Sequence, residues 1–400
     1  MGGRCIMRIY PLAIAMVSLL IFAGCAGVFR QEAVPEHLTA RAVIPGLEDV
    51  RYRIGIDTEA LIMDANISFD REIAHLKASG HTGQLPPAHF LVISGGGDQG
   101  AFAAGLLNGW SVAGGRPEFK LVTGVSTGAL IAPFAFLGPA YDQQLRNLYT
   151  TISTSDIIKE RWFLAALTSD AMADTSPLWQ LVEREINESL LAAVAAEHEK
   201  GRMLFVATVD LDARYSVIWN LTKIAASGDP KALNLFRTVL IASASIPGAF
   251  PPVMIDVQAE GRSYQEMHVD GGTMSQLFIY PPDLHVKDMS VKRNVVRERQ
   301  AYIIRNAKLD PEWASVERQT MSIAERAISS LIHTQGIGDL YRVYLTTQRD
   351  GVDFNLAFIP ASFNTPHLKE FDSKYMQSLF QVGYDMAAGG YPWSKTPPDF

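Results

Sequence analysis

The hydrophobic pattern predicts that strands and helices alternate through the middle of the chain. Residues 89–94 form a short apolar run, which is typical of a buried parallel strand, and residues 101–110 continue with a helical pattern. The same order returns with an expected strand at 119–123 and a helical pattern at 129–137. Glycines lie between strand and helix both times. Two such units within about fifty residues predict an α/β fold with a mainly parallel sheet.

The remaining pattern extends this fold toward both ends of the chain. Amphipathic spacing predicts a helix over 58–79, ahead of the first buried strand. Further strands are expected at 203–209, 215–219, 302–305 and 354–359, and further helices at 231–244, 324–344 and 368–386. No linker-like stretch divides residues 85–390. We therefore expect one domain over 51–400, with a core at about 89–275 and a C-terminal extension of helices and strands at 300–400.

The N-terminus has the pattern of a bacterial export signal. Two arginines precede an apolar run at 9–22, and Cys25 follows after two small residues. The run is shorter than the roughly 20 apolar residues that a membrane-spanning helix needs, so export and cleavage are favoured over a permanent span. The segment resembles the bacterial lipoprotein signal, in which the cysteine is acylated and becomes the N-terminus, although Phe22 stands where that signal usually has leucine. An ordinary signal peptide that contains a cysteine is the alternative.

This signal carries expectations about where the protein resides. Residues 1–24 would be removed, Cys25 would be lipidated, and residues 25–50, which mix charge and proline without periodicity, would form a tether. Ala26 resembles the residue after the cysteine in lipoproteins of the Gram-negative outer membrane. We therefore expect a protein of the bacterial cell envelope whose acyl chains anchor it to a membrane, the outer membrane facing the periplasm.

Composition excludes one broad class of partner. The 400 residues carry a net charge of −7, so no basic surplus exists to neutralise the phosphates of a nucleic acid. With 48% hydrophobic residues the chain can fill a large core. No nucleic-acid partner is therefore expected, and the sequence carries no sign of a protein partner.

A Gly-x-Ser-x-Gly pentapeptide lies between an expected strand and an expected helix. It is formed around Ser126 by Gly124 and Gly128. In a nucleophile elbow the serine occupies a strained turn, the two glycines relieve crowding, and the N-terminus of the next helix faces the reacting centre. The position of the pentapeptide in the pattern predicts that Ser126 is a nucleophile. A plain structural turn is the alternative.

A glycine-rich loop follows the first buried strand. Gly95, Gly96 and Gly97 expose backbone N–H groups that can stabilise the oxyanion formed when a serine attacks an ester. Gly95, Gly97 and Gly100 also match the dinucleotide-binding pattern Gly-x-Gly-x-x-Gly. That pattern expects an acidic residue at the end of the next strand, whereas here the next strand ends at the serine pentapeptide. The loop therefore favours an oxyanion hole.

Asp270 follows an alternating stretch at 263–268 and precedes two glycines. On its own, Asp-Gly-Gly is typical of a turn. Serine is a weak nucleophile at its free pKa and needs a base within hydrogen-bond reach. An aspartate can serve as that base when burial raises its pKa toward the working pH. Asp270 is therefore the candidate general base.

Taken in order, these blocks resemble the patatin-like phospholipase family. The family pattern is a glycine-rich oxyanion loop, a Gly-x-Ser-x-Gly nucleophile, a segment of small residues with proline, and an Asp-Gly-Gly base; residues 242–252 supply the third block here. The resemblance covers about residues 89–275. It implies a three-layer α/β/α fold, a Ser126–Asp270 dyad without a catalytic histidine, and no metal or organic cofactor. It also implies hydrolysis of acyl esters of lipids, of the phospholipase A or lysophospholipase type.

Two residues depart from the family pattern. Many relatives have aspartate at the start of the glycine loop and arginine or lysine before its last glycine, whereas this chain has Ser94 and Gln99. The missing cation removes a group that could bind a phosphate head group at that place. The backbone donors remain, so ester chemistry is still expected.

Two other functions stay open from the sequence. An α/β-hydrolase would use a Ser-His-Asp triad, in which His285, His333 or His367 follows Asp270 along the chain. His268 lies two residues before Asp270 and would point to the same face of a strand. A non-enzymatic envelope lipoprotein that kept a hydrolase-like fold is the other possibility.

Aromatic and aliphatic residues cluster near residue 165. Trp162, Phe163, Leu164 and Leu167 could line an acyl groove, although packing in a core is the commoner role of such residues. The rest of 151–200 carries no recognisable chemistry.

Overall fold

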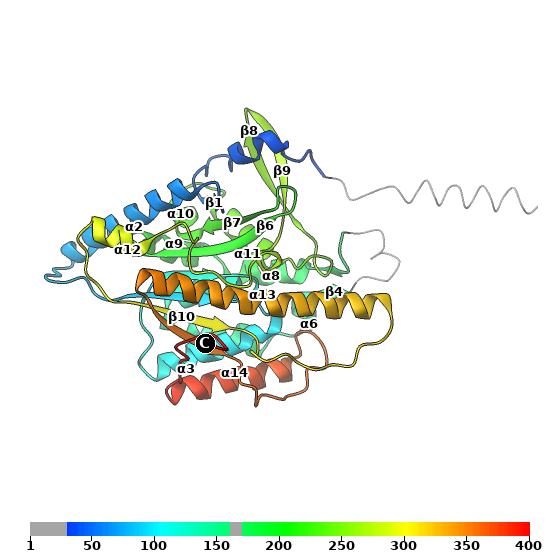
Figure 1. Cartoon of the computed structure of the whole chain (residues 1–400). Coiled ribbons are helices and arrows are strands. Elements are labelled where there is room, and N and C mark those ends of the chain that lie inside the picture. The colour runs from blue at the N-terminus through cyan, green and yellow to red at the C-terminus, as the bar shows by residue number, and fades with distance from the viewer. Residues whose placement is uncertain (1–29, 161–169) are drawn as a thin grey trace, which may run out of the picture.

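A computed structural model describes residues 30–160 and 170–400 of the chain. Within these residues a nine-stranded sheet forms the centre of the molecule (Figure 1). Its parallel strands are, in sheet order, β6 (Met203–Asp210), β3 (Phe119–Gly124), β2 (Ala88–Ile93), β10 (Arg299–Arg305) and β11 (Asp353–Phe358). The expected α/β fold with a mainly parallel sheet is thereby confirmed.

Antiparallel strands extend the sheet on the β6 side. β7 (Tyr215–Asn220) pairs with β6, and β1 (Arg51–Arg53) pairs with β7. A hairpin of β8 (Val253–Ala259) and β9 (Arg262–Asp270) joins the same strand β6 through β9, with Asp270 opposite Thr208. The end of β9 therefore lies at the carboxyl end of the parallel strands, which is the edge where α/β sheets bind their ligands.

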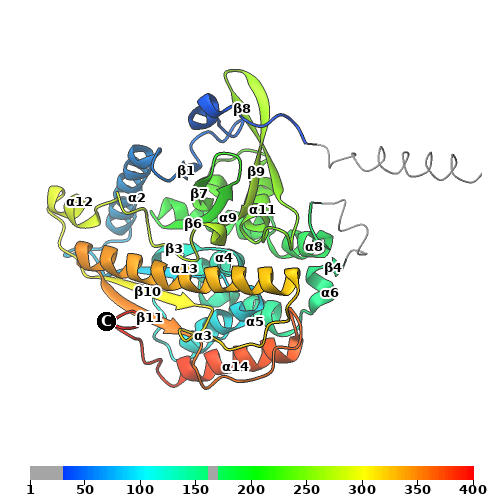
Figure 2. The same ribbon diagram turned by 45° about the vertical axis from the view of Figure 1, so that its right-hand side comes forward.

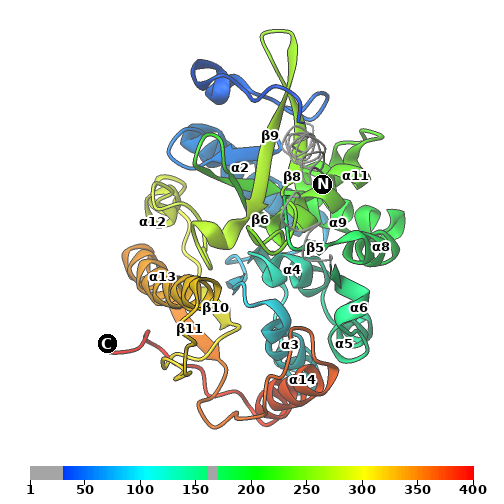
Figure 3. The same cartoon turned by 90° about the vertical axis from the view of Figure 1, so that its right-hand side faces the viewer.

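Helices cover both faces of the sheet. One layer contains α3 (Ala101–Val112), α4 (Thr127–Leu137), α5 (Asp142–Thr150), α8 (Ser176–Glu185), α9 (Glu188–Glu199), α10 (Leu221–Ala226), α11 (Ala232–Ser243) and α14 (Ser373–Ala388), and the other contains α2 (Thr58–Ala78), α12 (Val286–Lys292) and α13 (Thr320–Asp350). Figure 3 shows α12 and α13 on one side and α3, α5, α8 and α14 on the other. The apolar side chains of each layer form their own core against the sheet.

The long helix α13 lies across the sheet beside β10 (Figure 2). It is longer at both ends than the helix expected over 324–344, because its exposed turns carry no amphipathic pattern. The short elements are η1 (Glu36–Arg41), η2 (Gly97–Gly100), η3 (Pro139–Tyr141), η4 (Gly271–Thr273), α6 (Thr154–Ile157), β4 (Lys159–Glu160) and β5 (Ala173–Asp174).

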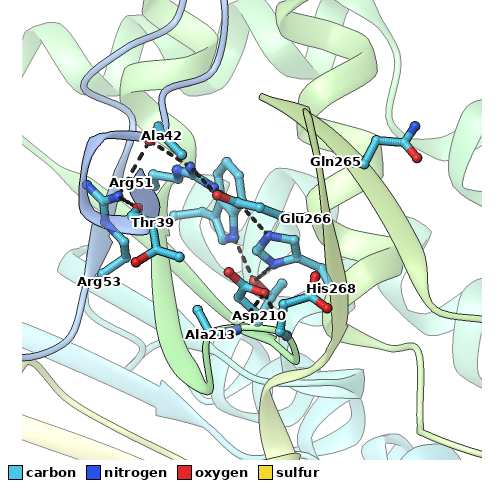
Figure 4. A network of polar contacts seen from close by, with 12 residues as sticks. Thr39, Ala42, Arg51, Arg53, Asp210, Ala213, Gln265, Glu266 and His268 are labelled. Carbon is cyan, nitrogen blue, oxygen red and sulfur yellow. Dashed lines mark hydrogen bonds and ion pairs between the residues drawn. The ribbon is translucent and has the colours of Figure 1, made fainter. Parts of the chain in front are cut away.

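The chain from residue 33 to 50 packs against the domain, so the expectation of a tether over 25–50 is wrong for these residues. Val43 exchanges two backbone hydrogen bonds of 2.9 Å with Gln258 of β8. Arg51, which follows directly, forms a buried ion pair with Glu266 of β9 (Figure 4). The buried apolar side chains of the segment are Val34, Leu38, Ala42, Ile44, Leu47 and Val50. Their irregular spacing is invisible to a search for periodicity, although it buries apolar surface as well as a regular pattern would.

Some expected features lie outside the described residues. These are the signal peptide at 1–24, the lipidation site Cys25 and the apolar cluster of Trp162, Phe163, Leu164 and Leu167. Among the residues that the structure does describe, no helix combines the length and the apolar character needed to cross a bilayer.

Candidate active site

Ser126 occupies the turn between β3 and α4. Its backbone has a φ of 56° and a ψ of −125°, a strained conformation that an L-residue holds only when its surroundings force it. A Cβ atom at Gly124 would collide with the carbonyl oxygen of Gly128, and one at Gly128 would collide with the carbonyl oxygen of Ile93. Both glycines of the pentapeptide are therefore required for this turn, which has the geometry of a nucleophile elbow.

The segment 242–252 links the elbow to the end of β9. The Ser243 hydroxyl accepts the backbone N–H of Ser126 at 3.1 Å and donates to the carbonyl of Ala207 at 2.7 Å. The carbonyl of Ser245 accepts the backbone N–H of Asp270 at 2.9 Å. The sequence marked this segment only as a block of the family pattern, and the structure gives it a positioning role.

Asp270 lies beside the Ser126 hydroxyl and is only 4% exposed. Its Oδ1 atom accepts the backbone N–H of Gly272 at 2.7 Å. Burial raises the pKa of Asp270 to about 7, while hydrogen bonding to the Ser126 hydroxyl and to the Gly272 N–H lowers it. Near neutral pH both the carboxylate and the carboxylic acid are therefore populated, and these are the two forms that general base and general acid catalysis need.

The glycine-rich loop turns beside Ser126, since a Cβ atom at Gly95 would lie 3.2 Å from the Cβ of Ser126. Gly96 and Gly97 have φ of 148° and 57°, which other residues rarely adopt. The N–H of Gly95 donates to the carbonyl of Gln276 at 3.1 Å, so the expectation that Gly95 supplies an oxyanion donor does not hold in this conformation. The N–H groups of Gly96 and Gly97 have no acceptor within the described residues.

A further donor lies at the start of α4. The first N–H groups of a helix have no partner inside the helix, and no described residue accepts the N–H of Thr127. The helix dipole also favours negative charge at this end. The sequence pointed to a helix N-terminus here without singling out Thr127.

Two pockets flank the glycine-rich loop. The polar pocket has a volume of about 360 Å³, and Gly95 and Gly96 are among the residues that line it. The apolar pocket has a volume of about 60 Å³, and Gly97 and Thr127 are among its lining residues. Side chains of α4, α5, α6, α8, α11 and α14 line the apolar pocket, whereas the end of β10 and the first half of α13 line the polar one. Neighbours of Ser126 thus line both spaces: Gly95, which packs beside it, lines the polar pocket, and Thr127, which follows it, lines the apolar one.

None of the nine histidines, all of which the structure describes, is a hydrogen-bond partner of Ser126 or Asp270. The ring nitrogens of His268 lie 2.8 Å from the Thr208 hydroxyl and 3.0 Å from the Glu266 carboxylate (Figure 4). The other three candidates have different surroundings. His285 pairs with Asp288, His333 lines the polar pocket, and His367 pairs with Asp98. The dyad candidates thus lie together without a histidine.

Asp98, His367 and Glu370 come close enough to one another to be considered as metal ligands, with candidate ligand atoms all within 4.8 Å. Asp98 and His367 form an ion pair at 2.7 Å, and the Phe371 N–H donates to the same carboxylate at 2.9 Å. These contacts account for the cluster as a link between the glycine-rich loop and the segment before α14. The cluster carries no assignment of a metal.

Comparison with family models gives a match for the middle of the chain. Residues 91–282 match the family model of the patatin-like phospholipases. This part of the chain, which is just under half of it, is therefore similar to a patatin-like phospholipase domain. A comparison with curated proteins gave no match.

Two solved structures are similar to parts of this chain. VipD from Legionella pneumophila has 11% sequence identity and a TM-score of 0.38, and the match covers 76% of this chain and 66% of VipD. The type III effector protein ExoU has 14% identity and a TM-score of 0.23, with 76% of this chain and 53% of ExoU covered. The likeness to the patatin-like phospholipases rests on the family match and not on these two structures.

Proposed function

We propose that the protein hydrolyses carboxylic esters of lipids through a dyad of Ser126 and Asp270. The observation that carries this proposal is the buried Asp270 carboxyl group beside the Ser126 hydroxyl, with a pKa of about 7. A carboxylate with that pKa is a stronger base than one with the usual pKa near 4, yet it is still available at neutral pH. The strained backbone of Ser126 holds the hydroxyl in one position, which favours a preorganised nucleophile.

The proposed reaction has two halves. Asp270 accepts the hydroxyl proton while the Ser126 oxygen attacks the ester carbonyl carbon, and the N–H groups of Gly96, Gly97 and Thr127 stabilise the oxyanion. The protonated Asp270 then gives its proton to the leaving alkoxide, which leaves the acyl group on Ser126. In the second half, Asp270 takes a proton from water, water attacks the acyl ester, and the proton returns to Ser126 as the fatty acid leaves.

The apolar pocket supports a lipid acyl chain as the group transferred. Gly97 and Thr127, two of the proposed oxyanion donors, line this pocket. An acyl chain bound in the pocket would therefore have its ester carbonyl oxygen near these two N–H groups. Apolar side chains such as Leu130 and Leu181 line the pocket and would exclude water from the chain.

A Ser-His-Asp triad is the competing mechanism. Ester turnover in Asp270→Asn, set against single alanine variants of His268, His285, His333 and His367, separates the two mechanisms. The dyad predicts a large loss at Asp270 and small changes at the histidines. A large loss at any histidine, in a variant that stays folded, would favour the triad.

The nucleophile is tested by labelling with a fluorophosphonate probe. Wild-type protein is expected to react, whereas Ser126→Ala should lose the label and roughly 10⁴-fold or more of its lipid ester turnover. Ser227→Ala, a change at an exposed serine, is the matched control and should keep both. A Ser126→Ala protein that is still labelled and active would remove the basis of the proposal, and a scaffold without activity would not be labelled in any form.

We also propose that acylated Cys25 holds the protein in the bacterial cell envelope, with the outer membrane facing the periplasm as the expected site. The support is the signal pattern that ends at Cys25. Palmitate labelling should disappear in Cys25→Ala and persist in Cys5→Ala, since Cys5 lies in the part removed. Equal labelling of Cys25→Ala would end this proposal.

A further inference from the structure

The polar pocket beside the glycine-rich loop contains a buried cation. The pocket has a volume of about 360 Å³, and one of its lining residues, Gly95, lies next to Ser126. Arg305, the last residue of β10, lines it and is only 3% exposed. The guanidinium packs against α13 at Gly336, where any side chain would collide with it. The fold thus leaves space for this one side chain at the wall of the pocket.

Arg305 has no carboxylate partner. Within the described residues its hydrogen bonds go to the carbonyls of Lys308 and His333, both at the long distance of 3.4 Å, and no ion pair includes it. Both carbonyls belong to residues that line the pocket, so the guanidinium lies between them at the pocket wall.

Burial lowers the pKa of Arg305 to about 10, and the charge of Asp339 on α13 raises it. Asp339 forms no ion pair or hydrogen bond with Arg305: its Oδ2 accepts the backbone N–H of Gln276 at 2.6 Å, and its Oδ1, which has no hydrogen-bond partner among the described residues, lies 3.1 Å from the guanidinium of Arg342. A buried charge that is neither paired nor fully hydrogen-bonded destabilises a folded protein. An anion bound in the pocket would relieve that cost.

The other charged groups of the pocket leave a positive surplus. Lys308 pairs with Glu312 at 2.7 Å, so these two charges offset each other. Arg326 adds a second cation to the lining, and Asp310 is the remaining acid. Burial lowers the pKa of His333, as does the charge of Arg305, and both disfavour its charged form. Two cations against one acid in the lining favour an anionic ligand.

We propose that this pocket binds the phosphate group of a lipid head group, with the guanidinium of Arg305 as its main ligand. The proposal rests on the proposed function of Ser126, because it names the head group of the ester that Ser126 attacks. A guanidinium presents a planar fork of donors that matches two phosphate oxygens. Arg305 supplies from β10 the positive charge that Gln99 does not supply from the loop.

Exposed apolar side chains favour a lipid over a soluble phosphate. Trp313 is 88% exposed and follows a residue of the pocket lining, and Leu331 is 70% exposed between two lining residues. Ile332 lines the pocket and is also exposed. An exposed apolar side chain in the lining, as at Ile332, is typical of a surface that meets apolar material. The pocket therefore suits a head group that is attached to acyl chains.

The first test compares two substrates that share an acyl chain and differ in the phosphate, lysophosphatidate and monoacylglycerol. In Arg305→Gln the ratio of their kcat/KM values is expected to fall about 10- to 100-fold relative to wild type, because a charge-assisted contact to the phosphate is lost. Arg41→Gln removes the same charge at an exposed site and should leave the ratio unchanged. An unchanged ratio in Arg305→Gln would overturn the proposal.

The second test uses wild-type protein, so it stands even if Arg305→Gln does not fold. Turnover of p-nitrophenyl butyrate is measured with a dihexyl glycerol ether that carries phosphate, with the same diether without phosphate, and with inorganic phosphate. The phosphate-bearing ether should inhibit at a concentration at least about tenfold lower than either of the others. Equal inhibition by the neutral diether would overturn phosphate recognition, and equal inhibition by inorganic phosphate would overturn the lipid source.

Failure of this inference is distinct from failure of the proposed function. If Ser126→Ala loses labelling and turnover while the kcat/KM ratio of the two substrates is unchanged in Arg305→Gln, the proposed nucleophile is retained and the proposed head-group site is rejected. If Ser126→Ala keeps its turnover, both fall together.

Discussion

The two pockets beside the glycine-rich loop differ in chemistry, in size and in the layer of the fold that builds them. The polar pocket is about six times the volume of the apolar one, at about 360 Å³ against about 60 Å³. It is lined by the end of β10 and by α13, whereas helices α4, α5, α6, α8, α11 and α14 line the apolar pocket. The loop follows β2 in the middle of the sheet, so it divides the two layers at the carboxyl ends of the strands.

This difference teaches that the two ends of a lipid ester can be recognised by separate parts of one chain. Apolar side chains bind an acyl chain through its area alone, so such a pocket sets the length of chain that is accepted. A buried guanidinium instead recognises one chemical group and rejects ligands that lack it. Substitutions in one pocket should therefore change one selectivity and leave the other.

Apart from loss of the nucleophile, the largest effect is expected at Asp270, which lines neither pocket and lies beside the Ser126 hydroxyl. Asp270→Asn removes the base and should lower kcat/KM for every ester by about 10²- to 10⁴-fold, whatever its head group or chain. In wild type, kcat/KM should rise with pH along an acidic limb centred near pH 7, because the pKa of Asp270 is about 7. A pH profile of lipid ester hydrolysis measures both. An acidic limb near pH 4 would show that the aspartate titrates as an ordinary exposed one.

The same substitution has a consequence for stability. Burial raises the pKa of Asp270 from 3.8 to about 7, so ionisation of this group opposes folding as pH rises through that range. Below pH 4 both the folded and the unfolded state hold the proton, and the cost is absent. Above pH 7 the cost is complete, and Asp270→Asn should raise the free energy of unfolding by up to about 4 kcal/mol. Asp256→Asn, an exposed change on the same hairpin, is the control and should show no such pH dependence.

The turn at Ser126 and the candidate base Asp270 could be proposed from sequence because the chemistry expected of them requires particular residues at fixed places. Gly124 and Gly128 lie where any side chain would collide with the backbone, so only glycine fits at these two positions and the motif can be recognised in the sequence. The strands β2 and β3 are equally direct, since a strand that is buried on both faces consists mostly of apolar residues. Sequence thus predicts features whose physical cause is local.

Features that depend on distant contacts could not be predicted in this way. Arg305 ends a strand of ordinary composition, and only the pairing of Ile304 with Ile93 brings that strand end beside the glycine-rich loop. The engagement of the Gly95 N–H by Gln276 is a second example, because the two residues are far apart in the chain. The packed segment at 33–50 is a third, since it gains its order from the hairpin on which it lies.

An intermediate effect is expected when the apolar pocket is filled. Leu181 lines it from α8 and is buried, and Leu181→Phe adds volume to a space of only about 60 Å³. The kcat/KM ratio of p-nitrophenyl dodecanoate to p-nitrophenyl butyrate should fall about tenfold, because one or two methylene groups no longer fit. Leu345→Phe, at an exposed position of α13, should keep the wild-type ratio. If Leu181→Phe changed the preference for phosphate-bearing substrates and not the preference for chain length, the two pockets would not control separate selectivities.

The smallest effect is expected from adding a charge to the polar pocket. Gln99 lines this pocket, and its side-chain amide donates to the Tyr375 hydroxyl at 3.3 Å. Gln99→Arg places a cation in the loop where many patatin-like proteins have one. Inhibition by the phosphate-bearing diether should strengthen about two- to fivefold, the range of a partly exposed ion pair, while inhibition by the neutral diether stays the same. Inhibition constants measured against p-nitrophenyl butyrate report both values.

The origin of that gain can be separated from packing. Gln99→Met also removes the hydrogen bond to Tyr375 but adds no charge, so it should not strengthen phosphate binding. A gain that comes from charge should shrink at about 0.5 M salt, where the screening length is only a few ångström, and a gain from packing should persist. Equal strengthening for both diethers would mean that the arginine acts on the acyl side of the loop, and the polar pocket would then lose its distinct role.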